Sequence, residues 1–244
     1  MEWLLLAVTG VVSGVAAGLL GIGGGLILVP VLIWLLTRRG VPLEIAVNMA
    51  VATALGVIVF TALSSLWAHH RRGAVRWGLV RLIAPWIALG ALVGAALAHY
   101  LGGYWVAIIF VLFALYTAWR MWRSAHFVEG EVLALRWPRS VGVGAGVISA
   151  MVGIGGGSIT VPYLRWHHLP MVNAVATGAA LGYPIAISSV LTYIALGWGQ
   201  SFHVPSWGYV YWPGLLIIAV CSVVSAPWGA ALAHRWPTRY LARI

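Results

Sequence analysis

Two copies of one glycine-rich segment are the part of this sequence best suited to chemistry. The letters GIGGG occur at residues 21–25 and again at 153–157, each time inside a long apolar run. Glycines at such places predict a break that ends one half-helix and begins another. The N-terminus of a helix carries free N–H groups and about half a positive charge, and glycine lets an anion approach that backbone closely. We therefore expect the half-helices 26–36 and 158–166 to form an anion site, with tight packing of small residues as the alternative.

Each GIGGG segment is followed by polar side chains at matching positions. The letters AVAT at 50–53 recur at 174–177, which pairs Thr53 with Thr177, and a pair of serines follows in each copy. Such hydroxyl groups can donate hydrogen bonds to an oxyanion, but buried hydroxyls also commonly bond to their own helix backbone. Both interpretations stay open for the threonines, and the backbone interpretation is favoured for the serines and asparagines. The further residues considered as lining the substrate path are Asn48, Ser64, Ser65, Ser158, Asn173, Ser188 and Ser189.

The composition excludes a soluble enzyme. Of the 244 residues 62% are hydrophobic and only 7% are charged, with a mean hydropathy of +0.99, whereas about a quarter of the residues in a soluble domain are charged. The formal net charge is +10, from 14 basic residues, all of them arginine, against 4 acidic ones. These arginines lie in short clusters between apolar runs, which is typical of the loops that orient a membrane protein. We therefore expect a lipid bilayer as the surroundings and no nucleic-acid partner.

The positions of the acidic residues bear on the substrate. None of the four glutamates, Glu2, Glu44, Glu129 and Glu131, lies inside a long apolar run. A carrier of sodium or metal cations usually presents a carboxylate within the membrane, so the sequence favours an anionic substrate. Cys221 is the only cysteine, and the spacing of the histidines is not typical of a metal site. We expect no metal, no cofactor and no catalytic residue.

The apolar runs define the expected membrane segments, because a bilayer core takes about 20 apolar residues as a helix. The runs are 3–36, 45–68, 79–99, 104–119, 141–166, 171–197 and 208–233. The first run would be about 51 Å long as one helix, which is too long for a single span. We expect repeat 1 at 1–123, with a re-entrant hairpin and three spans, and repeat 2 at 141–244, with a hairpin and two spans. A connector at 124–140 separates them.

The two halves are copies of each other. GIGGG recurs at an offset of 132 residues (153 − 21), the AVAT segment and the serine pair at 124 (177 − 53), and GAALAH at 135 (229 − 94). Collinear matches with such small changes in offset indicate an internal duplication, which is common in transporters.

The arginines distinguish parallel from inverted repeats. If every run crosses the membrane once, 8 arginines fall on one side and 6 on the other. If the two GIGGG runs are hairpins that return to the side they entered, the division is 12 to 2. Cytoplasmic loops carry the excess of basic residues, so we expect inverted repeats with the N-terminus outside and with the connector and the C-terminus cytoplasmic. A single tilted span over 141–166 is the alternative.

The duplicated GIGGG…VP motif, the AVAT segment and the closing stretch 208–234 resemble the TauE/SafE family over about residues 10–236. Its members are sulfite exporter-like integral membrane permeases of bacteria and archaea. The resemblance implies a permease in the prokaryotic plasma (inner) membrane for sulfite, a sulfonate or a related organosulfur anion. The pore-lining residues that it implies are Gly23, Gly24, Gly25, Thr53, Gly155, Gly156, Gly157 and Thr177. The family usually has one more helix, whose counterpart here would begin near residue 239 and continue beyond Ile244.

The sequence thus predicts an all-α membrane protein with two inverted repeats, each broken at GIGGG. The predicted function is a secondary transporter, working as an exporter, that binds a small sulfur oxyanion between the two breaks and moves it by alternating access. An anion channel is the first alternative, and an intramembrane enzyme or assembly factor is the second. Gly156-Gly157-Ser158 resembles the serine segment of an intramembrane protease, but no glycine follows the serine. The expected partners are the small anion, the bilayer and, as a possibility of assembly, a second copy in a homodimer.

Overall fold

The computed structural model describes residues 2–21, 23–123, 135–200 and 202–235, and most of them lie in helices. These ranges hold nine helices and no strand, apart from one isolated bridge between Trp207 and Val210. The helices are α1 (Glu2–Leu20), α2 (Gly25–Arg38), α3 (Leu43–His70), α4 (Trp77–Leu101), α5 (Gly103–Arg123), α6 (Pro138–Val152), α7 (Gly157–Trp166), α8 (Met171–Leu196) and α9 (Trp212–Arg235). The predicted all-α class is confirmed. Most of the predicted connector, and the segment after residue 235, lie outside the described residues.

Five helices in the described ranges are long and apolar enough to cross a membrane. They are α1, α3, α4, α8 and α9, with mean hydropathies of 1.6 to 2.1 over their most apolar windows. A helix satisfies its own backbone hydrogen bonds, which is what a membrane-spanning segment needs. The chain is therefore a multi-pass membrane protein. Length and hydropathy qualify α1 as a span, whereas the hairpin prediction makes α1 one arm of a hairpin.

Both apolar runs that contain GIGGG are broken at that segment. α1 ends at Leu20 and α2 begins at Gly25, while α6 ends at Val152 and α7 begins at Gly157. A positive φ occurs at Gly153 in the second break and at three glycines of the first, Gly21, Gly23 and Gly24. Only glycine adopts this conformation routinely, because a Cβ would crowd the following carbonyl group. Glycine at these positions is thus a requirement of the backbone.

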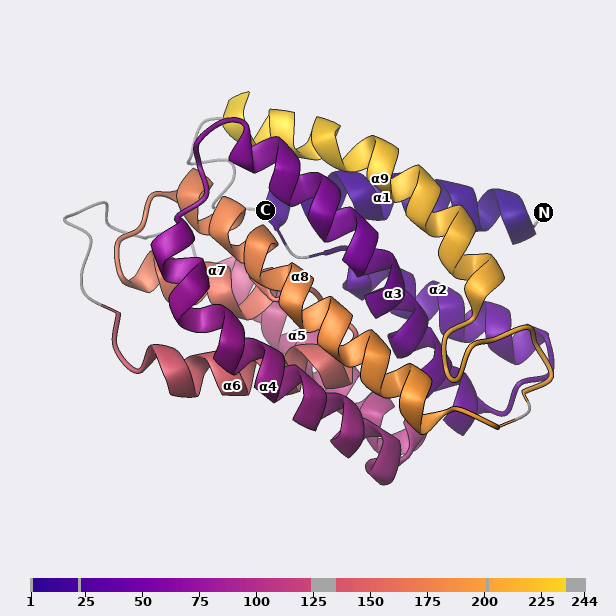
Figure 1. Cartoon of the computed structure of the whole chain (residues 1–244). Helices are drawn as coiled ribbons and strands as arrows, with labels where there is room; N and C mark the ends of the chain where they lie inside the picture. The colour runs from indigo at the N-terminus through magenta and orange to yellow at the C-terminus, as the bar shows by residue number, and fades with distance from the viewer. Residues whose placement is uncertain (1, 22, 124–134, 201, 236–244) are drawn as a thin grey trace.

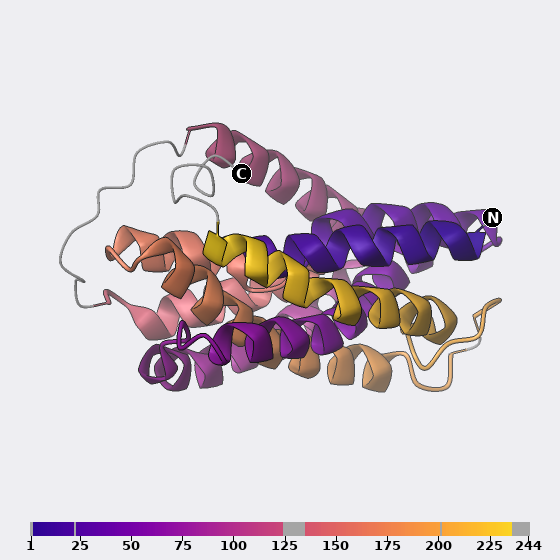
Figure 2. The same cartoon turned by 90° about the horizontal axis from the view of Figure 1, so that it is seen from above.

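The helices of the two halves are interleaved (Figures 1 and 2). α1 of the first half packs along α9 of the second, and α4 packs along α6. α3 and α8 contact each other in the middle of the bundle and run in opposite directions, α3 from right to left in Figure 1 and α8 from left to right. Each half therefore covers the other, and the two halves share one core.

The α1–α9 and α4–α6 interfaces are built in the same way. A Cβ at Gly229 of α9 would lie 2.1 Å from the carbonyl oxygen of Val15, and a Cβ at Gly94 of α4 would lie 2.3 Å from that of Val147. Val15 and Val147 are 132 residues apart, and Gly94 and Gly229 are 135 apart. These are the offsets of the sequence repeat, so the duplication extends to individual backbone contacts. Small residues allow this close approach, as is usual between membrane helices.

The arginines described in the structure form two groups, which lie at opposite ends of the helix bundle. α3 and α7 end, and α4, α6 and α8 begin, at the left of Figure 1, whereas α2 ends at the right. The arginines on or beside the left-hand helix ends are Arg71, Arg72, Arg76, Arg81, Arg136, Arg139 and Arg165. Arg38 and Arg39 lie at the end of α2. Which end faces the cytoplasm stays a prediction.

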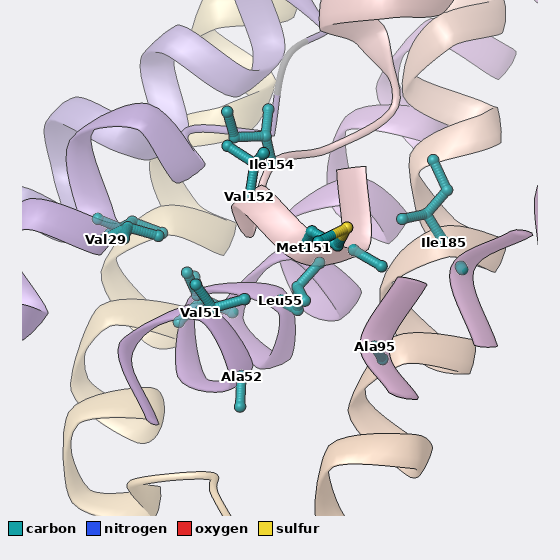
Figure 3. Close-up of a cluster of buried hydrophobic side chains, with 14 of the residues drawn as sticks. Val29, Val51, Ala52, Leu55, Ala95, Met151, Val152, Ile154 and Ile185 are labelled. Carbon is teal, nitrogen blue, oxygen red and sulfur yellow. The ribbon is translucent and has the colours of Figure 1, made fainter. Parts of the chain in front are cut away.

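The second break is embedded in the hydrophobic core (Figure 3). Val152 and Ile154, which flank Gly153, are fully or almost fully buried, together with Val29 of α2 and Val51 of α3. A Cβ at Gly153 would lie 2.9 Å from a side-chain carbon of Val29 and 3.2 Å from the Cα of Val51. Packing from both halves therefore holds the break in place.

Candidate functional site

The two glycine breaks touch each other. A Cβ at Gly23 would lie 2.9 Å from the Cα of Gly155, and a Cβ at Gly25 would lie 2.0 Å from the carbonyl oxygen of Gly153. No side chain larger than hydrogen fits at that second contact. The tight-packing role therefore holds for Gly25, whereas Gly23 and Gly155 have a further feature, because they border a cavity.

The half-helices that start at the breaks lack a side-chain cap at their N-termini. Gly24 precedes α2 and Gly156 precedes α7, and neither helix has a side-chain hydrogen bond at its N-cap. The first N–H groups of a helix have no acceptor within the helix, and each such N-terminus carries partial positive charge. α7 is only ten residues long.

A small cavity lies at the contact between the breaks. Its lining is Ala17, Gly21, Gly23, Ile58, Ala62, Ser65, Gly155, Ala179 and Gly182. These residues come from α1, both breaks, α3 and α8. The space open to the centre of a water-sized sphere is about 10 Å³, which corresponds to about one water molecule. Three predicted site residues therefore border one space, Gly23, Ser65 and Gly155.

Ser65 is the one lining residue of this cavity with a polar side chain. Its side chain is almost completely buried, at 1% exposure, and its hydroxyl group makes no hydrogen bond. A buried hydroxyl without a partner is unfavourable, and such groups in native proteins call for an explanation. The position of Ser65 on the cavity wall supplies one, because a bound polar molecule would complete its hydrogen bonds.

The two predicted threonines lie away from the cavity and make the same contact twice. The Thr53 hydroxyl accepts a hydrogen bond of 2.9 Å from the backbone N–H of Tyr211, just before α9, and donates one of 2.6 Å to Met49. The Thr177 hydroxyl accepts one of 3.2 Å from the N–H of Arg76, just before α4. Each threonine thus holds the start of a helix of the other half. Thr53 also makes the bond to its own helix backbone that the sequence left open, whereas the bonds to the other half were not predicted. Substrate binding by the threonines stays a prediction.

The predicted asparagines and Ser64 are also outside the cavity. Asn173 donates a hydrogen bond of 2.8 Å to the carbonyl oxygen of Ala74, which ties α8 to the loop before α4. Ser64 donates one of 2.9 Å to the carbonyl oxygen of Val223 in α9. The side-chain oxygen of Asn48 is buried and makes no hydrogen bond.

The remaining predicted site residues, three serines and four glycines, also lie outside the cavity lining. The hydroxyls of Ser158 and Ser189 are buried without a hydrogen bond, so Ser158 is not bonded to any histidine. Ser188 is half-buried on α8. None of these three serines lines the cavity. The same is true of the other motif glycines, Gly24, Gly25, Gly156 and Gly157.

Six lining residues were not predicted from the sequence, and all are small or aliphatic. They are Ala17, Gly21, Ile58, Ala62, Ala179 and Gly182. One signal was available, because residues 58, 62 and 65 are spaced by four and three, as are positions on one face of a helix. Apolar residues at helical spacing are too common in a membrane protein to indicate a site by themselves.

Beyond Ser65, a paired contact ties α3 to α1. The Nε2 atom of His69 lies 3.2 Å from the carbonyl oxygen of Gly18. In the second half the Tyr193 hydroxyl donates a hydrogen bond of 3.3 Å to the carbonyl oxygen of Ala150. These residues are again related by the offsets of 124 and 132. His69 therefore has a structural role, because it joins α3 to the backbone of α1.

A cluster of polar side chains joins three helices where α1 and α9 begin and α2 ends. Arg39 donates to the Glu2 carboxylate at 2.7 Å and to the Tyr211 hydroxyl, and its guanidinium also lies over the Trp3 ring. Burial raises the pKa of Tyr211, and the positive charge of Arg39 partly opposes that shift. Tyr211 is therefore a neutral phenol at neutral pH.

Comparison with known proteins assigns the chain to a class. The model of the family "Sulfite exporter TauE/SafE" matches residues 6–244. A "Probable membrane transporter protein" of Haemophilus influenzae is 33% identical over 241 residues, which cover 98% of this chain and 91% of that protein. "Probable membrane transporter protein YunE" of Bacillus subtilis is 27% identical over 100% of this chain and 93% of its own length. A further relative, from Methanocaldococcus jannaschii, is 24% identical over 97% of this chain and 88% of its own. No solved structure matches.

The helical fold, the two broken helices and these relatives together define a membrane transporter. The chain belongs to the TauE/SafE family. The resemblance recognised in the sequence is confirmed.

Proposed function

We propose that this protein is a secondary transporter that exports a small sulfur-containing oxyanion, such as sulfite or a sulfonate, across the prokaryotic plasma membrane. One observation carries the proposal. The two breaks meet beside a cavity that includes Gly23, Gly155 and the unpartnered hydroxyl of Ser65. The substrate class is supported by the name of the family.

The electrostatic surroundings of the cavity suit an anion, because no carboxylate lines it. No lining residue carries a charge, and the two described glutamates lie in the first turns of α1 and α3. The attraction for the substrate then comes from the N-termini of α2 and α7, each with partial positive charge. Irregular backbone within a membrane is tolerated where it is buried or lines a cavity, which is the situation of both breaks.

The size of the cavity bears on the mechanism. Room for about one water molecule is too little for sulfite, so the cavity must widen before it can hold the substrate. Transport then requires the two breaks to separate, first toward one face of the membrane and then toward the other. Inverted repeats perform this by rocking one bundle against the other. The opposite directions of α3 and α8 (Figure 1) support the inverted relation.

Flux into liposomes tests the substrate. Purified protein is reconstituted, and uptake of sulfite and of isethionate, a small sulfonate, is measured against protein-free liposomes. We expect saturable flux that is accelerated by substrate on the opposite side, since a carrier shows such counterflow and a channel does not. Absence of flux for both anions, with a control carrier active in parallel, would refute the proposed substrate class.

Filling the cavity tests the site. Ala62 lies on the cavity wall, so Ala62→Leu should occupy the space and abolish flux. Ala118→Leu is the matched control, because Ala118 is exposed on α5 and its new side chain would face lipid. Unchanged flux in Ala62→Leu would place the substrate path elsewhere.

A further inference from the structure

The cavity draws unequally on the two halves of the protein. Four of its nine lining residues form two repeat-related pairs, Gly23 with Gly155 and Ile58 with Gly182. The other five lining residues are Ala17, Gly21, Ala62, Ser65 and Ala179. Their counterparts at the offsets of 132 and 124 are Ser149, Gly153, Ala186, Ser189 and Leu55. None of these five counterparts lines the cavity.

The counterpart positions are as deeply buried as the lining of the cavity, where Ser65 has 1% and Ala17 has 2% of its surface exposed. Ser149 has 2% of its surface exposed, and Ala186, Ser189 and Leu55 have none. Leu55 lies in the core close to Met151 (Figure 3) and replaces the small Ala179 of the open side. The cavity therefore extends from the contact between the breaks toward Ser65, and neither Ser149 nor Ser189 lines it.

Two hydroxyl groups are left without partners in the closed counterpart. Neither Ser149 nor Ser189 makes a hydrogen bond through its side chain. Other buried serines of the bundle do form such bonds; Ser222, for example, lies 2.6 Å from the Thr61 hydroxyl. Buried hydroxyls without partners are unfavourable, and here they recur at the repeat-related position of the cavity serine, Ser65.

We propose that Ser149 and Ser189 form a second substrate vestibule, which opens on the opposite face of the membrane when the vestibule of Ser65 closes. The inference rests on the proposed transport function and names the residues of its second state. In that state the hydroxyls of Ser149 and Ser189 contact the oxyanion. At the equivalent positions the first vestibule has the apolar Ala17 and the hydroxyl of Ser65. Leu55 must withdraw for the second vestibule to open. The substrate thus meets one side-chain hydroxyl on one side and two on the other.

Single-cysteine labelling tests this inference. Cys221 is the only native cysteine, so Cys221→Ser gives a background without thiols. Ser65→Cys, Ser149→Cys and Ser189→Cys are each added to it, in membrane vesicles of both orientations, and treated with an impermeant maleimide. The control is Ser222→Cys, at an equally buried serine whose hydroxyl is hydrogen-bonded. Each variant is used only if its melting temperature in detergent matches that of the Cys221→Ser parent.

We expect Ser65→Cys to react from one face and Ser149→Cys and Ser189→Cys from the other, each at least about tenfold faster than Ser222→Cys, because thiol reactivity follows exposure. Excess isethionate should slow all three reactions. Labelling of Ser65→Cys and Ser189→Cys from the same face would overturn the inference, and so would an unreactive Ser189→Cys in protein that transports.

The labelling and flux experiments fail independently. Opposite-sided labelling without flux of sulfite or isethionate would refute the proposed substrate and leave the second vestibule standing. Flux of these anions together with same-sided labelling would refute the second vestibule and leave the proposed substrate standing. Leu55→Ala adds a further measurement, because a smaller side chain there should speed the labelling of Ser189→Cys and leave Ser65→Cys unchanged.

Discussion

The two halves of this transporter share their backbone contacts and differ in the side chains around the cavity. Thr53 and Thr177 accept from the backbone before α9 and before α4. Gly94 and Gly229 meet equivalent carbonyl groups. In contrast, Ser65 lines a cavity, whereas its equally buried counterpart Ser189 does not line it.

This difference separates two kinds of duplicated residue. Contacts repeated in both halves hold the frame, so their loss should destabilise the protein equally in either half. Residues whose surroundings differ between the halves belong to the part that changes conformation, so their loss should alter transport more than stability. The predictions below test this division, in order of decreasing effect on stability.

The largest effect is expected at the contact between the breaks. In Gly25→Ala the new methyl group would lie 2.0 Å from the carbonyl oxygen of Gly153, and the surrounding core cannot yield. Overpacking against backbone should lower the free energy of unfolding by more than about 3 kcal/mol. Thermal melting in detergent measures it, with Gly144→Ala as control, because a Cβ at Gly144 meets nothing within 4 Å. Equal melting temperatures would show that the breaks do not need their close contact.

The next effect concerns the matched interfaces. Gly94→Ala and Gly229→Ala each bring a methyl group within 2.3 Å or less of a carbonyl oxygen. Helix pairs can separate slightly, so we expect a loss of about 1–3 kcal/mol for each and similar melting temperatures for the two variants. A large loss in one variant alone would mean that the two interfaces are not equivalent.

The threonines should come third. Thr53→Val and Thr177→Val each leave the backbone N–H before a helix without its acceptor, which costs about 1–3 kcal/mol when that group is buried. Thr→Ser at the same positions should restore stability. The KM for transport should not change, since neither threonine borders the cavity. A raised KM at normal stability would instead favour the predicted substrate contact.

The smallest effect on stability is expected at Ser65. Ser65→Ala removes a hydroxyl that has no partner, so the free energy of unfolding should change by less than about 0.5 kcal/mol. The KM for the anion should rise about tenfold, because a hydrogen bond to a charged group contributes about 1.5–3 kcal/mol. Ser222→Ala, which breaks a bond to Thr61, should instead lower the free energy of unfolding and leave the KM unchanged. A normal KM in Ser65→Ala would remove this serine from the site.

The sequence by itself determined the fold class, the duplication and the position of both breaks. Apolar runs of membrane length and the GIGGG letters act locally, because a helix forms within its own segment and a run of glycines interrupts it there. The TauE/SafE resemblance followed from the same letters. The helix bounds differ from the predicted runs by a few residues at each end, and the glycines of each break fall where they were expected.

Only the tertiary structure decided which polar residues face the cavity. The pattern AVAT and the serine pair are duplicated alike, yet Thr53 and Thr177 bond to distant helix starts and only Ser65 borders the space between the breaks. Contacts such as Thr53 with Tyr211 join residues 158 positions apart, and local propensity carries no information about them. The difference between Ser65 and Ser189 depends on how the halves pack against each other, because the same residue type at the same repeat position lines the cavity in one half and not in the other.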